Sequence, residues 1–190
     1  QAAFLLMMTW VNTVAYFMQT DLIARRFSAL DARTQAIADI DLMVNVSSAV
    51  ILALGLGPIL RRFGVKAGLI LNPIFMVPAF VAVLVWPSVL TIQLVQVVRR
   101  VGQYAVARPS REICFTVVEQ NSRYRAKNVI DTVVYRFGDL SSAWVQTALR
   151  VAGFGVVGAV ALGVAASAFW GWTATRLSTQ YEMLRAAPAA

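Results

Sequence analysis

Residues 108–139, RPSREICFTVVEQNSRYRAKNVIDTVVYRFGD, form a charged run that lies between two strongly apolar segments and carries ionic groups into the second of them. Hydrophobic residues make up 59% of the chain and charged residues 14%, whereas soluble domains have roughly half and a quarter. In so apolar a chain, groups that are costly in lipid indicate functional positions. The composition therefore predicts an integral membrane protein.

Apolar segments recur before and after this run, along nearly the whole chain. Each approaches the ~20 residues that a helix needs to cross ~30 Å of hydrocarbon. Alternation of apolar and polar residues at period two is absent, which argues against a membrane barrel. We expect an all-α integral membrane domain over residues 1–175 and a cytoplasmic tail over residues 176–190. The six expected spans are residues 4–22, 41–60, 67–86, 89–107, 129–149 and 151–173.

The distribution of basic residues predicts the orientation. With the amino end inside, the cytoplasmic segments carry Arg61, Arg62, Lys66, Arg108, Arg111, Arg123, Arg125, Lys127, Arg176 and Arg185. The opposite side carries Arg25, Arg26, Arg33 and Arg150. The positive-inside bias therefore places both termini in the cytoplasm. The net charge of +8 reflects topology and contact with anionic lipid, so no nucleic-acid partner is expected.

The residue inventory excludes several kinds of catalytic site within this chain. There is no histidine and a single cysteine, Cys114, so zinc sites, thiol–histidine pairs and serine–histidine triads cannot be built from its own residues. We expect no enzyme activity, no metal and no cofactor. Because Gln1 is not an initiator residue and an apolar helix begins directly after it, the chain is expected to be a piece of a longer protein.

A polar stripe runs along the fourth span. Gln93, Gln96, Arg100 and Gln103 fall within an arc of about 80° on a helix, and Arg99 lies beside that arc. Arginine at bilayer depth must face water, a partner or a ligand, and the guanidinium matches phosphate or carboxylate oxygens. The stripe indicates an anion site. The alternative is that one or both arginines extend to the cytoplasmic headgroups.

The fifth span has a longer stripe, within about 100° of arc. It consists of Asp131, Tyr135, Asp139, Ser142, Gln146 and Arg150. Such a face lines a cavity or a polar contact between helices. Arg136 precedes Asp139 by three residues, the spacing of an ion pair on a helix. This pair is interpreted either as a gate or as a structural clamp.

Weaker stripes occur on two further spans, and the sixth span differs from all of these. The stripe residues are Asp41, Asn45 and Ser48 in the second span, and Thr9, Asn12, Thr13, Tyr16 and Thr20 in the first. The sixth span is rich in glycine and alanine, which favours close packing between helices over nucleotide binding by its GFGVVG segment.

The charged run resembles the cytoplasmic loop and following helix of the ATP/ADP exchanger group of the major facilitator superfamily, through RPSRE and RAKNVIDTVVYR-GD. Residues 57–68, GPILRRFGVKAG, are similar to a degenerate copy of a loop signature of that superfamily, with Leu60 in the place of the usual acidic residue. Six spans with both ends inside resemble its carboxyl-terminal half. The matching positions in the run are Arg108, Arg111, Glu112, Lys127, Asp131, Arg136 and Asp139.

The resemblance implies half of a secondary transporter that exchanges an anionic solute, such as a nucleotide, by alternating access in a bacterial inner membrane. Its partner is then a missing amino-terminal six-helix half or a second membrane subunit. On this interpretation Arg99 and Arg100 bind the anion. The neutral binding residues are Gln93, Gln96, Asn45 and Tyr16, and the gating or coupling residues are Arg136, Asp139, Asp131, Arg111, Glu112 and Lys127.

Two alternatives remain open from the sequence. One is a proton-coupled metabolite or drug carrier in which Asp139 or Asp41 titrates. The other is a membrane scaffold that transports nothing and whose polar stripes hold helices together. Transport predicts that polar residues of several helices converge on a cavity, whereas a scaffold predicts that they pair with one another.

Overall fold

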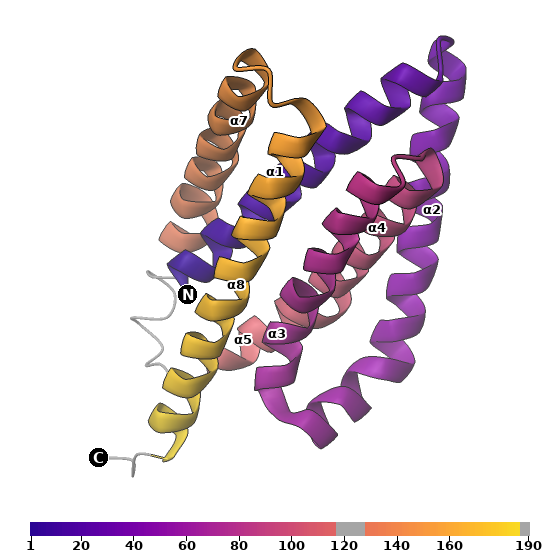
Figure 1. Ribbon diagram of the computed structural model, residues 1–190. Coiled ribbons are helices and arrows are strands. Elements are labelled where there is room, and N and C mark those ends of the chain that lie inside the picture. The colour runs from indigo at the N-terminus through magenta and orange to yellow at the C-terminus, as the bar shows by residue number, and fades with distance from the viewer. Residues whose placement is uncertain (117–127, 187–190) are drawn as a thin grey trace.

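The computed structural model describes residues 1–116 and 128–186, and every element in these ranges is helical (Figure 1). The α-helices are α1 (Ala2–Arg26), α2 (Leu30–Val50), α3 (Leu56–Val85), α4 (Val89–Val101), α5 (Arg108–Cys114), α7 (Tyr135–Val151) and α8 (Gly155–Ala186). Three π-helical segments, η1 (Ile51–Gly55), η2 (Gly102–Ala107) and η3 (Ile130–Val134), continue or precede them. The prediction of an all-α fold is confirmed.

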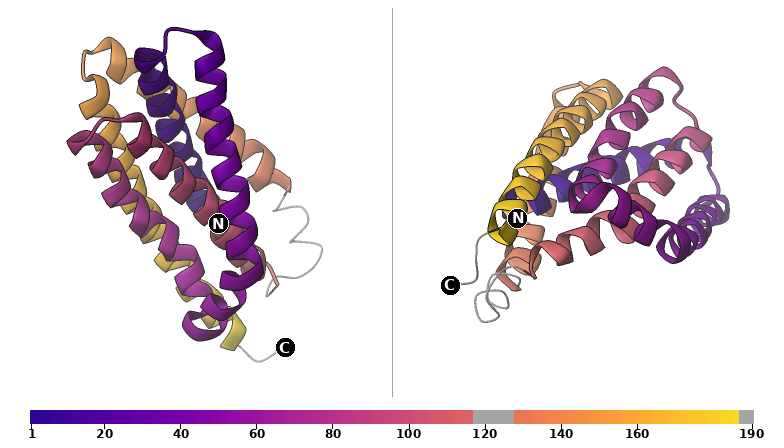
Figure 2. Two further views of the ribbon diagram at one scale, coloured as in Figure 1. Left: turned by 90° about the vertical axis from the view of Figure 1, so that its right-hand side faces the viewer. Right: turned by 90° about the horizontal axis from the view of Figure 1, so that it is seen from below.

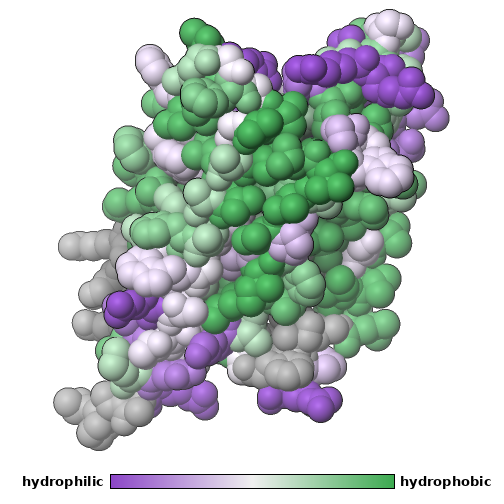
Figure 3. Space-filling view, in the orientation of Figure 1, coloured by the Kyte–Doolittle hydropathy of each residue, from purple (hydrophilic) through white to green (hydrophobic). Residues whose placement is uncertain are grey.

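Four helical segments are long and apolar enough to cross a membrane, which indicates a membrane protein. They are Ala2–Arg26, Leu30–Leu54, Gly64–Val85 and Gly155–Arg185. Figure 3 shows hydrophobic side chains over the middle of one face, with hydrophilic side chains gathered towards its upper and lower ends. The two other expected spans, residues 89–107 and 129–149, coincide with α4 and η2 and with η3 and α7, which carry the arginines and polar stripes. Their crossing of the membrane stays a prediction.

Several helices extend beyond the expected spans, because hydropathy marks the part of a helix that lies in hydrocarbon and not its ends. Helix α2 begins at Leu30, where its first turns bury Ala36 and Ile40 in a cluster with Ile23 of α1. Helix α8 continues to Ala186, through the residues expected as a tail, because Leu177 and Tyr181 still belong to the main core cluster.

Helix α1 is the centre of the bundle. It packs against α8, α7 and α4, while α3 packs mainly against α8 and α2 mainly against α4. The two views of Figure 2 place α2 at the edge of the bundle. The turn after α1 and the loop after α7 lie at the upper end of Figure 1, and the carboxyl end lies at the lower end. Because α1 packs against both α4 and α7, polar faces of these three helices lie close together.

Two glycines allow helices to approach closely. A Cβ atom on Gly163 of α8 would lie 2.9 Å from ring carbons of Phe80 of α3, which agrees with the close packing expected for the sixth span. A Cβ atom on Gly138 of α7 would overlap the Oγ1 atom of Thr9 on α1.

Helix α3 contains Pro73 and Pro78. The helix is kinked at Gly64, whose backbone is not helical and has φ of 72°.

We expect Cys114 to react slowly with alkylating reagents in the folded chain. Its side chain is 3% exposed, and burial raises the pKa of its thiol to about 11. The thiolate is the reactive species, so the rate of modification by iodoacetamide should keep rising about tenfold per pH unit from pH 7 to 10. In the unfolded chain the rate should level off near pH 9, and equal profiles in the two states would contradict the buried position.

Because Cys114 is buried, the predicted orientation is better tested at Thr116, which is exposed. In a Cys114→Ala background, Thr116→Cys should react with a membrane-impermeant maleimide in inverted vesicles and remain unmodified in intact cells. Modification from outside intact cells would reverse the topology.

Candidate functional site

An open pocket of about 580 Å³ lies where the polar faces of α1, α4 with η2, and α7 meet. Its lining residues are Asn12, Thr13, Tyr16, Phe17, Arg99, Arg100, Gln103, Tyr104, Tyr135, Asp139 and Ala143. Members of three polar stripes therefore converge on one cavity. Its volume is in the range of about 300–1,000 Å³ that is common for small-molecule sites.

Arg99 is the central cation of this pocket. Its side chain donates from Nε and Nη2 to Oε1 of Gln96, at 2.9 and 2.7 Å, and from Nη1 to Oδ1 of Asn12, at 2.6 Å. The residue is 7% exposed. Within the part of the chain that the structure describes, no carboxylate forms an ion pair with Arg99. Its hydrogen-bond partners in the described chain are thus neutral amides.

Contacts from three helices fix Arg99 and its partner. Gln96, one turn earlier on α4, is fully buried and donates from Nε2 to the carbonyl of Ala15, at 3.0 Å. The carbonyl of Arg99 accepts a bond from Nδ2 of Asn72, on α3, at 3.3 Å. Helices α1, α3 and α4 therefore determine where the guanidinium lies, which preorganises it for a ligand.

Arg100 also lines the pocket but is already paired. Its Nη1 forms an ion pair with Oδ1 of Asp41, on α2. This contact links α4 to the edge helix and offsets the charge of Arg100. Of the two arginines proposed as anion ligands, Arg99 is therefore the one without an acidic partner in the described chain.

The structure places two of the four neutral residues expected at the binding site in or next to the pocket, and the other two outside its lining. Tyr16, which is 55% exposed, lines the pocket, and Gln96 lies beneath Arg99. Gln93 is half-buried and Asn45 is exposed, and neither is among the lining residues. Asn12, a partner of Arg99, was placed on the first polar stripe but not at the site. The spacing of three residues between Gln96 and Arg99 is the signal in the sequence that could have identified their contact, but the polar arc of the fourth span favoured Arg100 instead.

The expected ion pair between Arg136 and Asp139 is not formed in the described chain. Arg136 is exposed, whereas Asp139 is half-buried, lines the pocket and accepts a hydrogen bond from Oγ1 of Thr13, at 3.4 Å. Positions three apart on a helix point about 60° from one another, so one side chain can face the pocket while the other faces away. A gating role of these residues stays a prediction.

Among the described residues near this region, Arg111 instead forms an ion pair with Asp131. Nη1 of Arg111 lies 2.7 Å from Oδ1 of Asp131, and Nη2 lies 3.8 Å from Oε1 of Glu112. These three residues line a second pocket, of about 430 Å³, which shares Tyr135 with the first. Lys127, also expected to take part in gating, lies outside the described residues.

Comparisons with protein-family models, curated protein sequences and solved structures give no match. The resemblance to the exchanger group therefore rests on the charged run and on the arrangement of spans. What can be argued about function comes from the pocket itself.

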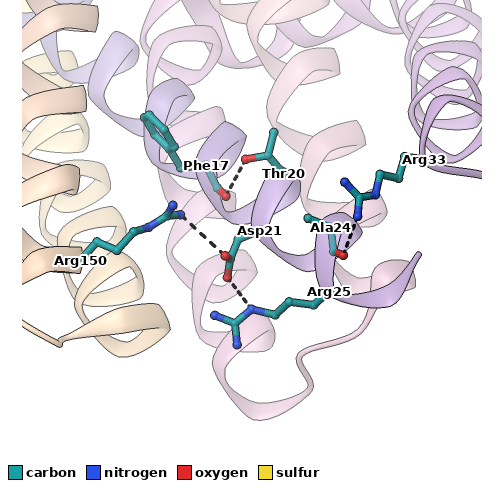
Figure 4. Close-up of polar contacts among 7 residues, drawn as sticks. All are labelled: Phe17, Thr20, Asp21, Ala24, Arg25, Arg33 and Arg150. Atoms are coloured by element: carbon teal, nitrogen blue, oxygen red, sulfur yellow. Dashed lines mark hydrogen bonds and ion pairs between the residues drawn. The ribbon is translucent and has the colours of Figure 1, made fainter. Parts of the chain in front are cut away.

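Charged residues at the carboxyl end of α1 have a structural role (Figure 4). Asp21 lies between Arg25, at 2.9 Å, and Arg150, at 3.8 Å, and so links α1 to α7. Arg33 of α2 donates to the carbonyls of Phe27 and Ala24, at 2.7 and 3.2 Å. The last carbonyls of a helix lack partners within it, so these bonds stabilise the turn between α1 and α2.

Proposed function

We propose that the chain is one half of a secondary transporter and that Arg99 binds an anionic group of a small solute. The observation that carries this proposal is a buried guanidinium in a polar pocket without an acidic partner in the described chain. Arginine at bilayer depth costs at least ~2.5 kcal/mol on the most lenient scale. Protein polar groups offset that cost only in part, and a bound anion would offset more of it.

The guanidinium retains donors for such a ligand. Of the five N–H groups of an arginine, three are used by Gln96 and Asn12. The two that remain are on the two terminal nitrogens. Carboxylate and phosphate groups accept two parallel hydrogen bonds from a guanidinium. This pair of donors could therefore bind either group.

The exposed groups on the open side of the pocket favour the presence of a partner bundle. Tyr16 and Tyr104 are 55% and 47% exposed there, and half of the side chain of Asp41, the partner of Arg100, is accessible. Such groups are costly towards lipid. A second six-helix bundle, as an amino-terminal half or a separate subunit, would cover them and complete the cavity in which alternating access operates. A bacterial inner membrane, with both termini inside, is part of the same proposal.

The resemblance supports a nucleotide of the ATP/ADP type as one such solute. A second candidate is a proton-coupled carrier, which is favoured by Asp139, because this carboxylate lines the pocket without an ion pair in the described chain. The pairs Arg100 with Asp41, Arg111 with Asp131 and Trp10 with Ser141 would suit a scaffold. A scaffold gives no reason for a buried Arg99 that has no carboxylate partner among the described residues.

We expect Arg99→Lys to weaken anion binding at least tenfold, since lysine keeps the charge but loses the planar pair of donors. The 190-residue chain in lipid nanodiscs is titrated calorimetrically with ATP, ADP, butyrate and ethyl phosphate. Arg185→Lys, at an exposed position in the last turn of α8, is the matched control and should bind as the parent chain does. If no probe binds the parent chain, or if Arg99→Lys changes none of the affinities, the anion site is refuted.

A further inference from the structure

We infer that the solute of this pocket carries a cationic group as well as an anionic one, with the cation bound at Asp139. This inference rests on the proposed function and specifies its substrate class as small zwitterions. It starts from the charges that line the pocket. Arg100 is neutralised by Asp41, which leaves Arg99 and Asp139 as the two charges without an ionic partner in the described chain.

Asp139 has free capacity to accept hydrogen bonds. A carboxylate has about four lone-pair sites, and its recorded side-chain contact is a long bond, 3.4 Å, from the Thr13 hydroxyl to one oxygen. A half-buried carboxylate with one weak donor is poorly compensated. An ammonium group, with three donors, would supply both charge and hydrogen bonds.

Arg99 and Asp139 reach the pocket from different helices. Arg99 lies on α4, and Asp139 lies one turn from the amino end of α7. Tyr135, one turn before Asp139 on α7, lines the same pocket. Tyrosine rings attract cations on their faces, so Tyr135 adds to the binding of a positive group on the α7 side. The pocket is thus positive on its α4 wall and negative on its α7 wall.

This polarity discriminates between classes of solute. A multiply charged anion would gain from Arg99 but would be repelled by Asp139, and this repulsion would be stronger once a partner bundle covers the open side of the pocket and shields it from water. A zwitterion matches both walls and leaves no charge of the pocket unpaired. Gln103, which also lines the pocket, is 3% exposed, and its Oε1 has no hydrogen-bond partner in the described chain. This oxygen could accept a hydrogen bond from a ligand that carries donors, such as an ammonium group.

The test compares probes that differ only in an amine. In nanodiscs, the parent chain is titrated with phosphoethanolamine against ethyl phosphate, and with 4-aminobutyrate against butyrate. We expect the amine-bearing member of each pair to bind at least tenfold more tightly. Asp139→Asn should reduce this preference to less than threefold and should tighten the binding of ethyl phosphate, because a repulsive charge is removed. Asp139→Glu keeps the carboxylate and should retain the preference.

The outcomes separate this inference from the proposed function. If ethyl phosphate and butyrate bind as tightly as their amine-bearing partners and Arg99→Lys weakens them, the anion site stands and the zwitterion inference is wrong. An unchanged preference in Asp139→Asn also overturns it. Binding of ethyl phosphate to that variant shows that the variant is folded, and absence of binding by every probe to the parent chain refutes both proposals.

Discussion

Gly138→Ala should lower the free energy of unfolding by about 2 kcal/mol, within the range of about 1–3 kcal/mol for overpacked sites. The new methyl group would overlap Oγ1 of Thr9 and would lie 3.0 Å from its Cβ and 3.3 Å from Cδ1 of Leu6. Thr9 cannot easily give way, because it is fully buried and its hydroxyl donates to the carbonyl of Leu6, at 2.7 Å. Denaturant titration in detergent, followed by tryptophan fluorescence, measures the loss.

A second substitution and a control identify the cause. Thr9→Ala removes the hydroxyl that the methyl group would meet, so it should restore part of the stability when combined with Gly138→Ala. Gly171→Ala, in α8, adds a Cβ atom whose nearest recorded neighbour is Pro73 Cβ at 3.8 Å. This change should be neutral or stabilising by up to ~1 kcal/mol, through helix propensity. Equal stability of Gly138→Ala and the parent chain would show that α1 and α7 do not cross as described.

Asp131→Ala should destabilise the chain by about 2 kcal/mol. Removing one partner of a buried ion pair costs about 3–5 kcal/mol, and the value here is smaller because the Asp131 side chain is 33% exposed. Glu112, 3.8 Å from Arg111, also offsets part of the loss. The Arg111 side chain is 7% exposed and would lose its nearest carboxylate partner. The same denaturant titration measures this loss.

A double-mutant cycle distinguishes this pair from the one expected from the sequence. Arg111→Ala and Asp131→Ala should couple by more than ~1 kcal/mol, whereas Arg136→Ala and Asp139→Ala should couple by less than ~0.5 kcal/mol. The reverse ranking would restore Arg136 and Asp139 as the ionic pair of this region.

The helical fold could be predicted because it depends on hydropathy and period, which the sequence displays directly. The partners of charged groups could not be predicted, because they depend on how helices pack. Arg99 and Arg100 are neighbours in sequence, and the arc of the fourth span favoured Arg100. The position of α2 beside α4 pairs Arg100 with Asp41 and leaves Arg99 to the pocket.

Changes of helical period also limited the prediction. The stripes were drawn at a constant angle per residue, but the π-helical segment η2 follows α4 and the π-helical segment η3 precedes α7. A π-helical turn holds more residues than an α-helical turn, so side chains beyond it are displaced around the axis. No composition signal marks these segments, and Gln103 and Asp131 both fall within them.

The polar contacts of α1 have a consequence for how the chain is assembled as it is made. Its Trp10 donates to Ser141, 131 residues later, and its Asn12 accepts from Arg99, 87 residues later. At about 5–20 residues per second of synthesis, Ser141 follows Trp10 by roughly 7–26 s. During that interval the polar face of α1 has no partners from α4 and α7. Helix α1 is thus made before the helices that supply its polar partners, so a protein that shields its polar face in the meantime would be most needed at that stage.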